Sequence, residues 1–226
     1  MSKIMDIIEC ARKNNQKALS EYDSKQVLSV YGIPVVEETM VDDLSGAQAA
    51  ARDLTYPVVL KACSAEISHK TEKGLIALDL RDDGEVKEAF NRLKSRCSGD
   101  VDKFLVQKMI KGERELVMGM TRDQQFGPCV MFGLGGIFTE ILEDVSFRVA
   151  PITEEDAFEM MEGIRGNRIL GGIRGLKAVD KKIMASSLIA LGKIGLEQDA
   201  IQEIDVNPLV IMDGNPVAVD ALVTLR

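Results

Sequence analysis

The 226-residue sequence has few aromatic side chains, a single histidine and no excess of positive charge. Tryptophan is absent, and aromatic residues make up 4% of the chain, so there is no stacking platform of the kind that binds single-stranded nucleic acid. The 36 acidic residues outnumber the 28 basic residues, which gives a net charge of −8. Because phosphate backbones require clustered positive charge, this balance argues against nucleic acid as the main partner.

Cysteine pairs and long apolar runs are also missing. Cys10, Cys63, Cys97 and Cys129 form no C-x-x-C pair, which argues against a zinc site and is typical of reduced thiols in the cytoplasm. No segment approaches the ~20 apolar residues of a membrane span. Residues 1–6 lack the uninterrupted apolar stretch of a signal peptide. We therefore expect a cytoplasmic protein without nucleic-acid or membrane partners.

Apolar periodicity and capping residues predict alternating helices and strands in the first half of the chain. The expected helices span 3–14, 20–31 (with Asp23 or Ser24 as a candidate cap), 45–54 and about 83–97 (capped by Asp82 or Asp83), and the expected strands span 35–41, 57–62, 74–80 and 103–110. Such an alternation indicates a small α/β lobe.

The second half has a different organisation, in which strands follow one another closely, as in an antiparallel sheet. The expected strands span 115–120, 129–132, 138–142, 201–206, 209–212 and 217–225, with helices from Thr153 and over about 180–195. Asp213-Gly214 lies between two β-rich runs and predicts a hairpin. Residues 163–175 contain five glycines and three arginines and are expected to be irregular, as a mobile loop or an anion-contacting loop.

The only histidine follows a predicted strand that ends in a lysine. The apolar run 56–60 leads into Lys61, and a polar loop then carries His69. A lysine at a strand end suits a phosphate clamp, and imidazole suits a nucleophile near neutral pH. A solvated surface histidine is the ordinary alternative for an isolated His.

The C-terminal hairpin is a candidate metal site. Strand periodicity places Glu203, Asp205 and Asn207 on one face, and the turn brings Asp220 back towards Asn207. Carboxylate and amide oxygens suit Mg²⁺, which leaves its other positions to water and phosphates. A polar, solvent-facing strand is the alternative.

Two further segments are weaker signals. Residues 106–116 predict a connector whose backbone groups could read an adenine edge, followed by a carboxylate for ribose. The glycines of 131–140 permit close approach of the backbone to a phosphate or a partner loop. This segment is no dinucleotide fingerprint, because Phe138 stands where a G-x-G-x-x-G motif starting at Gly133 needs glycine.

Three ordered motifs together resemble the ATP-grasp subunit of ADP-forming acyl-CoA synthetases, the acetate–CoA ligases related to succinyl-CoA synthetase. The motifs are Pro-Val-Val-Leu-Lys through Ser-His-Lys-Thr (57–71), Gly-Leu-Gly-Gly-Ile-Phe (133–138) and Glu-Ile-Asp-Val-Asn-Pro-Leu (203–209). The resemblance covers nearly the whole chain. It implies an α/β (α+β) protein with the ATP-grasp fold, whose two lobes clasp a nucleotide. Residues 1–105 would hold the N-terminal helices and first lobe, and residues 106–226 the second lobe with the metal-binding hairpin.

The resemblance also implies roles for individual residues, all of which concern ATP, ADP or Mg²⁺. Lys61 would hold nucleotide phosphates, and His69 would be transiently phosphorylated. The adenine pocket would be lined by Gln107, Lys108, Met109 and Ile110, and Glu115 would bind ribose with Glu113 close to the same position. Mg²⁺ would be held by Asn207 and Asp220, with the catalytic carboxylate of Asp205 nearby.

The implied activity is that of the nucleotide-binding β subunit of an acid–CoA ligase. Acyl-CoA, ADP and phosphate would interconvert with acid, ATP and CoA, and a CoA-binding α subunit would handle the acyl group. Two other classes stay open: an ATP-grasp carboxylate–amine ligase, which needs no phosphohistidine, and a non-catalytic nucleotide-binding module. The sequence does not identify the acyl group, the physiological direction, the preference for adenine or guanine, or the subunit stoichiometry.

Overall fold

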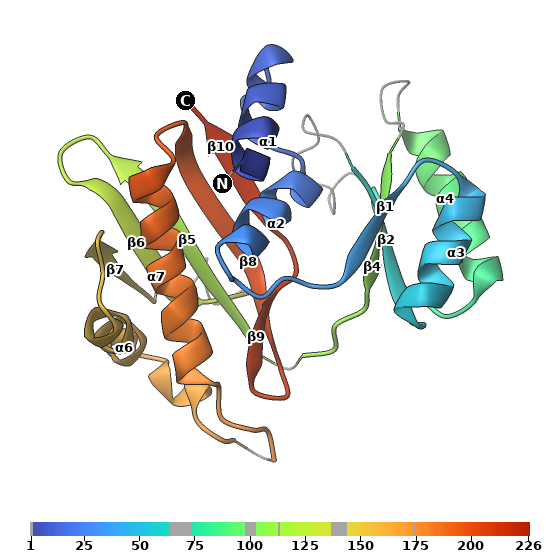
Figure 1. Cartoon of the computed structure of the whole chain (residues 1–226). Helices are drawn as coiled ribbons and strands as arrows, with labels where there is room; N and C mark the ends of the chain where they lie inside the picture. Colours follow the sequence, from blue (N-terminus) through green and yellow to red (C-terminus); the bar gives the residue numbers. More distant parts are fainter. Residues whose placement is uncertain (1, 64–73, 98–102, 113, 137–143, 174) are drawn as a thin grey trace. The chain divides into compact units, whose positions relative to one another are not determined.

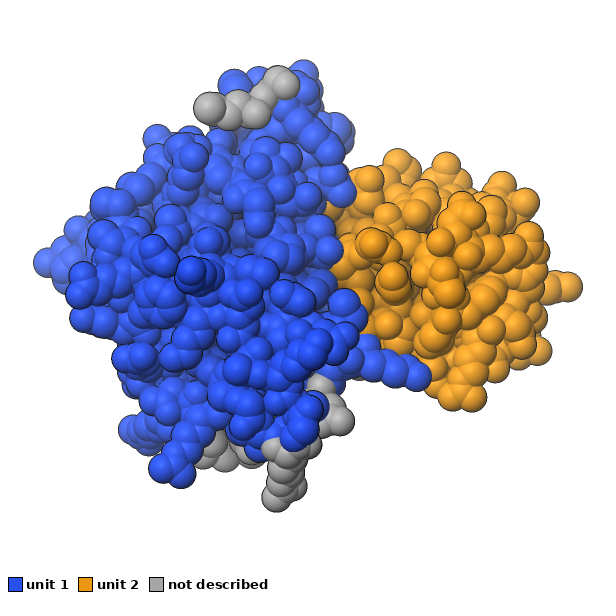
Figure 2. Space-filling view, turned by 60° about the horizontal axis from the view of Figure 1, so that its bottom comes forward, with its two compact units in different colours: residues 1–19, 23–35, 111–226 blue, residues 20–22, 36–110 orange. Residues whose placement is uncertain are grey.

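The chain folds into two compact units. The computed structural model describes residues 2–63, 74–97, 103–112, 114–136, 144–173 and 175–226. Unit 1 contains residues 1–19, 23–35 and 111–226, and unit 2 contains residues 20–22 and 36–110 (Figure 2).

Unit 2 is an antiparallel sheet with two helices on one face (Figure 1). Its elements are β1 (Glu38–Val41), α3 (Leu44–Leu54), β2 (Val58–Ala62), β3 (Ile76–Leu80), α4 (Asp83–Arg96) and β4 (Phe104–Lys108). Among the described residues, four strands pair in the order β1-β4-β2-β3. Alternate strand residues such as Leu60 and Val106 pack against Ala51 of α3 and Phe90 of α4. The opposite face of the sheet is not covered by α3 or α4.

The helix starts of unit 2 follow from their capping residues. The Asp43 carboxylate accepts the Gly46 N–H at 2.7 Å, and the Asp82 carboxylate accepts the Glu85 N–H at 2.9 Å. Each bond satisfies a backbone donor that the first helical turn leaves unpaired. Of the two candidate caps of α4, Asp82 is therefore the cap, and Asp83 is the first helical residue.

Unit 1 is built on a larger antiparallel sheet, as the second half of the sequence predicts. Its elements are α1 (Ser2–Lys13), α2 (Glu21–Val30, of which residues 21–22 belong to unit 2), β5 (Glu115–Asp123), β6 (Gly127–Leu134), β7 (Val145–Val149), α6 (Glu154–Gly163), η1 (Asn167–Leu170), α7 (Lys181–Glu197), β8 (Ile201–Met212), β9 (Asn215–Ala218) and β10 (Leu222–Leu225). In the described part of the chain, the strand order is β10-β8-β5-β6-β7, and β9 also pairs with β8. Helices α1, α2, α6 and α7 contribute to one core with this sheet.

Several strands of unit 1 differ from expectation. The runs 201–206 and 209–212 form the single strand β8, whereas 217–225 is divided between β9 and β10. The expected strand 138–142 lies outside the described residues. Strand β7 was not predicted. It pairs with β6 and leaves Phe147 and Val149 about half exposed, so its apolar alternation does not mark a buried face.

The N-terminal helices group with the second half of the chain, whereas the expected division placed them with residues 1–105. Ile4 and Ile8 of α1, with Val27 and Leu28 of α2, are buried in the core of unit 1. Helix α2 begins at Glu21, so neither Asp23 nor Ser24 caps it. The Ser24 hydroxyl instead accepts the Val223 N–H at 3.1 Å.

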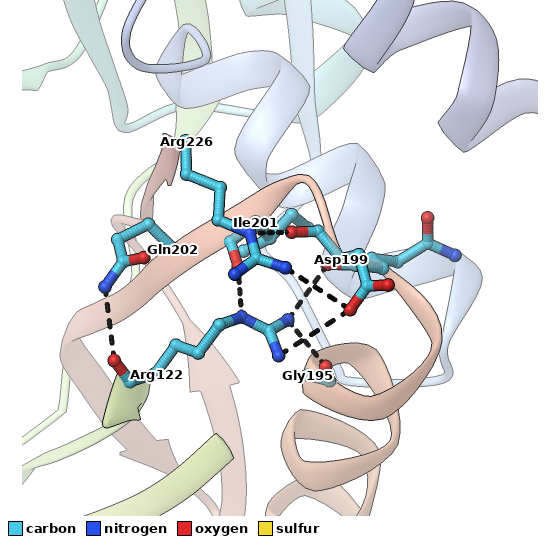
Figure 3. A network of polar contacts seen from close by, with 7 residues as sticks. Arg122, Gly195, Asp199, Ile201, Gln202 and Arg226 are labelled. Atoms are coloured by element: carbon cyan, nitrogen blue, oxygen red, sulfur yellow. Dashed lines mark hydrogen bonds and ion pairs between the residues drawn. The ribbon is translucent and has the colours of Figure 1, made fainter. Parts of the chain in front are cut away.

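An arginine-centred network fixes the end of α7 (Figure 3). The Arg122 guanidinium donates to the Gly195 carbonyl at 2.7 Å and to the Ile201 carbonyl at 3.1 Å. It also lies 3.9 Å from the Asp199 carboxylate, which pairs with Arg226 at 3.5 Å. The network joins β5, the C-terminal turn of α7 and the last residue of the chain.

A second buried arginine orders the glycine-rich segment 163–175. The Arg114 guanidinium donates to the carbonyls of Ile169 at 2.9 Å and Gly171 at 3.0 Å, and also to that of Lys177. Among its described residues, the segment contains the end of α6 at Gly163, η1 and an isolated bridge residue, Ile173, and the others are irregular, as predicted. In the residues that the structure describes, no helix combines the length and apolar character needed to cross a membrane.

Candidate functional site

The helix-free face of the sheet in unit 2 carries a buried polar set. Lys61 faces Leu105 across β2 and β4, and Gln107 faces Val59, so these four residues share the face opposite the core. Gln107 is fully buried and Lys61 is 4% exposed. Both residues were predicted to bind nucleotide, and the sheet register brings them together.

Lys61 is paired with a carboxylate that the sequence did not reveal. Its Nζ lies 2.6 Å from Oε1 of Glu21, the first residue of α2, and the two side chains are 5% and 2% exposed. Forty positions separate the pair, and Glu21 has the sequence pattern of an ordinary helix start. The Lys61 ammonium is buried and ion-paired, and an anionic phosphate is the ligand class that would compete for it.

The connector after β4 is partly committed to the chain itself. The Lys108 N–H donates to the Glu37 carbonyl at 3.0 Å, and the Met109 N–H donates to the Pro57 carbonyl at 3.1 Å. The Lys108 ammonium is 3.3 Å from the exposed carboxylate of Glu37. An adenine edge would therefore have to use the amide of Ile110 and neighbouring carbonyls rather than these two N–H groups.

In unit 1, the C-terminal hairpin sets Asn207 opposite Asp220. Leu209 of β8 faces Ala218 of β9, and Asp205 of β8 faces Leu222 of β10, so the same register puts Asn207 and Asp220 at the facing position between the two pairings. The turn has positive φ at Asp213 (51°) and at Gly214 (90°), as a two-residue hairpin requires. The predicted return of the chain is confirmed.

A bulge in β8 marks the same position. Met118 of β5 faces Val206 and Leu116 faces Leu209, so two residues of β8, Asn207 and Pro208, oppose one residue of β5. Pro208 has no N–H to donate, and a bulge tolerates that loss. Asn207 is exposed while its neighbour Val206 is buried. The bulge therefore presents the Asn207 amide outward from an otherwise regular ladder.

The third carboxylate of the set, Asp205, has a raised pKa. Burial raises the pKa of Asp205 to about 6, and the negative charges of Glu203 and Asp220 add to the shift. The carboxylates thus share one neighbourhood, as the strand pattern predicts. Neighbouring negative charges such as these favour a bound cation.

The donor set fits Mg²⁺ held jointly with a nucleotide. Asn207 and Asp220 offer hard oxygen donors, which Mg²⁺ prefers, and two protein ligands leave positions for phosphate oxygens and water. Within the described ranges, no group of three or more His, Cys, Asp or Glu side chains is placed to hold a metal.

Glu115 lies beside the glycine-rich motif. The Gly135 N–H donates to the Glu115 carbonyl at 2.9 Å, and a Cβ on Gly135 would lie 2.7 Å from the Glu115 carbonyl carbon. A Cβ on Gly136 would lie 3.1 Å from a carboxylate oxygen of Glu115. Within the chain, these glycines approach the start of β5 and the proposed ribose carboxylate. The expected approach to a phosphate or a partner loop stays a prediction.

The remaining predicted residues cannot be placed. His69 lies in 64–73, which is outside the described residues, as are Glu113 and residues 137–143 of the glycine-rich motif. Sequence analysis also missed Lys25 of α2, which is fully buried and whose Nζ donates to the Val219 carbonyl at 3.2 Å. No local signal distinguishes this lysine from an exposed one, because its partner is 194 positions away.

Comparisons with known proteins identify the family of the chain. A family model described as an ATP-grasp domain matches residues 10–225. The chain is 41% identical to the acetate–CoA ligase [ADP-forming] I subunit beta of Pyrococcus furiosus, with 100% of this chain and 99% of that protein covered. It is 39% identical to the acetate–CoA ligase [ADP-forming] I of Archaeoglobus fulgidus, with 86% of this chain and 29% of that longer protein covered.

Solved structures of one enzyme are similar over almost the full length. The dinucleotide-forming acetyl-coenzyme A synthetase 1 of Candidatus Korarchaeum cryptofilum, in complex with coenzyme A, Ca-AMPCP and HgCl⁺, matches with a TM-score of 0.94 and 37% identity, covering 98% of this chain and 99% of that chain. A second structure, with Mg-AMPPCP, matches with a TM-score of 0.88 and 38% identity over 99% and 100% of the chains. In that structure, a phosphohistidine segment points towards the nucleotide binding site.

Proposed function

Because this chain belongs to the ATP-grasp family, and within it to the β subunits of ADP-forming acetate–CoA ligases, we propose that it is the nucleotide-binding subunit of an acid–CoA ligase. It would transfer a phosphoryl group between a phosphohistidine and ADP or ATP. The observation that carries this proposal is the facing pair Asn207 and Asp220 at the bulge of β8, which suits a metal–phosphate ligand.

Different residues bind the phosphates, the adenine, the ribose and the metal ion. Lys61 binds phosphate oxygens, for which the Glu21 carboxylate is the resident substitute. The segment Gln107–Ile110 lines the adenine pocket, and Glu115 binds ribose. Asn207 and Asp220 bind Mg²⁺, which when present neutralises phosphate charge, and Asp205 lies beside them.

His69 accepts and returns the phosphoryl group. Its neutral imidazole nitrogen attacks the terminal phosphorus of ATP, and the bond from that phosphorus to the bridging oxygen breaks to release ADP; the reverse step forms ATP. The imidazole must be neutral, because imidazolium has no lone pair. The protein contributes mainly positioning and charge neutralisation, since phosphoryl transfer needs little other covalent chemistry.

A CoA-binding partner completes the reaction. Support comes from the subunit name of the Pyrococcus relative and from the Archaeoglobus relative, of which this chain matches only 29%. An α subunit in a hetero-oligomer would supply the rest. The four cysteines are free thiols, which supports a reducing, cytoplasmic location.

Labelling with γ-labelled ATP and Mg²⁺ tests the proposal. We expect acid-labile, base-stable label on the wild-type chain and none on His69→Ala. A carboxylate–amine ligase would stay active in His69→Ala, and a non-catalytic nucleotide-binding module would bind ATP without becoming labelled. Either result would replace the proposed function.

A further inference from the structure

Helix α2 packs against the segment that carries Asp220. The Leu19 N–H, just before the helix, donates to the Val223 carbonyl at 2.9 Å, and the Ser24 hydroxyl accepts the Val223 N–H at 3.1 Å. Lys25, one residue further along, reaches the Val219 carbonyl at 3.2 Å. Residues 219–223, which include the link from β9 to β10, are therefore held from one side by Leu19 and by the consecutive residues Ser24 and Lys25 of α2.

The peptide group between Val219 and Asp220 is the one that Lys25 contacts. The Val219 N–H donates to the Pro208 carbonyl at 3.1 Å, directly after the bulge residue Asn207. Its carbonyl, bonded to the nitrogen of Asp220, accepts from the Lys25 ammonium. Val219 is thus held to β8 through its N–H and to α2 through its C=O. The Cα of Asp220 is bonded to the nitrogen of this same peptide group.

Burying Lys25 needs an explanation in energetic terms. Its residue is 0% exposed, and an ammonium withdrawn from water is costly unless it gains charge-assisted hydrogen bonds. A methionine or leucine would fill the same space without that cost. The ammonium lies one peptide from a carboxylate that belongs to the set Glu203, Asp205 and Asp220.

We propose that Lys25 is a positioning residue for the divalent-cation site, and that it acts by fixing the Val219–Asp220 peptide so that the Asp220 carboxylate faces Asn207. This inference rests on the proposed function, which assigns the cation to Asn207 and Asp220. Lys25 does not touch the cation. Residues that orient metal ligands change metal affinity by about 10–100-fold when they are removed.

Mn²⁺ titration of the full chain with ADP, followed by electron paramagnetic resonance, tests the inference. We expect Lys25→Met to weaken Mn²⁺ binding about tenfold and to raise the Mg²⁺ concentration needed for His69 labelling, with the labelling rate restored at saturating Mg²⁺. Lys25→Arg, which keeps charge and donors, should recover most of the affinity. Unchanged or tighter Mn²⁺ binding in Lys25→Met would overturn the inference.

Three further variants separate the possible causes. Lys3→Met removes the same charge from α1, where Lys3 hydrogen-bonds Gln26 at 2.6 Å, and should leave Mn²⁺ affinity unchanged. Ser24→Ala should lower the melting temperature without changing Mn²⁺ affinity, so a loss of affinity there would mean that stability alone is responsible. Asp220→Ala should abolish the site; normal binding in that variant would remove the proposed metal role itself.

Should Lys25→Met fail to fold, Lys25→Gln replaces it in the titration. We expect weaker Mn²⁺ binding in Lys25→Gln, and wild-type binding would refute the inference.

Discussion

At the residue scale, the buried pair of Lys61 and Glu21 ties nucleotide binding to stability. Both side chains are almost fully buried and lie 2.6 Å apart. Removing one member of such a pair leaves the other charge uncompensated, whereas removing both can be nearly neutral. The proposed phosphate clamp is therefore held in place, before nucleotide arrives, by a carboxylate that does not bind nucleotide.

Glu21→Gln should lower the free energy of unfolding by about 3 kcal/mol, because it removes the negative charge of a buried ion pair with Lys61. ADP supplies a replacement anion, so it should raise the melting temperature of Glu21→Gln more than that of the wild type. Chemical denaturation and thermal shift measure the two effects. Glu37→Gln, at the exposed pair with Lys108, is the matched control and should cost less than about 1 kcal/mol. An equal ADP-induced shift in wild type and Glu21→Gln would contradict the proposed exchange of Glu21 for phosphate.

At the element scale, features that depend on neighbouring residues were predicted from the sequence, whereas features that depend on distant residues were missed. The start of α4 at Asp82, the start of α6 at Thr153 and the turn at Asp213-Gly214 depend on neighbouring residues. The last two were predicted as they stand, and Asp82 was one of two candidate caps. The continuity of β8 depends on its pairing with β5, and the roles of Glu21 and Lys25 depend on partners 40 and 194 positions away. Such long-range partners leave no local trace in a single sequence.

Arg122→Met should destabilise the protein by about 3 kcal/mol, as measured by chemical denaturation. The guanidinium, 12% exposed, donates to carbonyls at the C-terminal end of α7, and methionine replaces its stem but none of its hydrogen bonds (Figure 3). Arg148→Met is the control, because the guanidinium of Arg148 is 38% exposed and pairs with an exposed Glu159. We expect a cost below about 1 kcal/mol there. Similar losses in both variants would argue against a special role for Arg122.

The junction of α3 and α4 should be sensitive to alkaline pH. The Tyr56 hydroxyl donates to the Asp83 carboxylate at 2.6 Å, and burial together with that carboxylate raises the pKa of Tyr56 from 10.0 to about 12. The unfolded chain then loses this proton first, so the contribution of Tyr56 is complete below pH 10 and is lost between pH 10 and about pH 12. Tyr56→Phe should be insensitive to this loss. Denaturation curves of wild type and variant from pH 9 to 12, with the phenolate followed by ultraviolet absorbance, measure this loss. A difference in the free energy of unfolding between wild type and variant that stays constant over this pH range would contradict the prediction.

At the scale of the whole molecule, the chain carries the residues for a nucleotide and a metal in two separately packed units. Lys61 and Gln107 belong to unit 2, whereas Asp205, Asn207 and Asp220 belong to unit 1. The family and the ATP-grasp fold were predictable from three sequence motifs, and the comparisons confirm them. The division of the chain was less accessible, because the burial of α1 and most of α2 in unit 1 depends on packing with strands more than 80 residues later.

The chain should need its partner for acyl-CoA synthesis but not for its own phosphorylation. The chain has a single histidine, His69, so a phosphoryl relay that passes through a second histidine would need the partner subunit. The segment from Gly133 also lacks the glycine pattern of a CoA-binding dinucleotide fold. Purified alone, the chain should incorporate label from γ-labelled ATP and form no acyl-CoA. Adding the CoA-binding subunit should restore turnover, and adding it to His69→Ala should not. Acyl-CoA synthesis by this chain as the only protein present would show that acyl transfer takes place here, and the assignment of one half-reaction to each subunit would then be wrong.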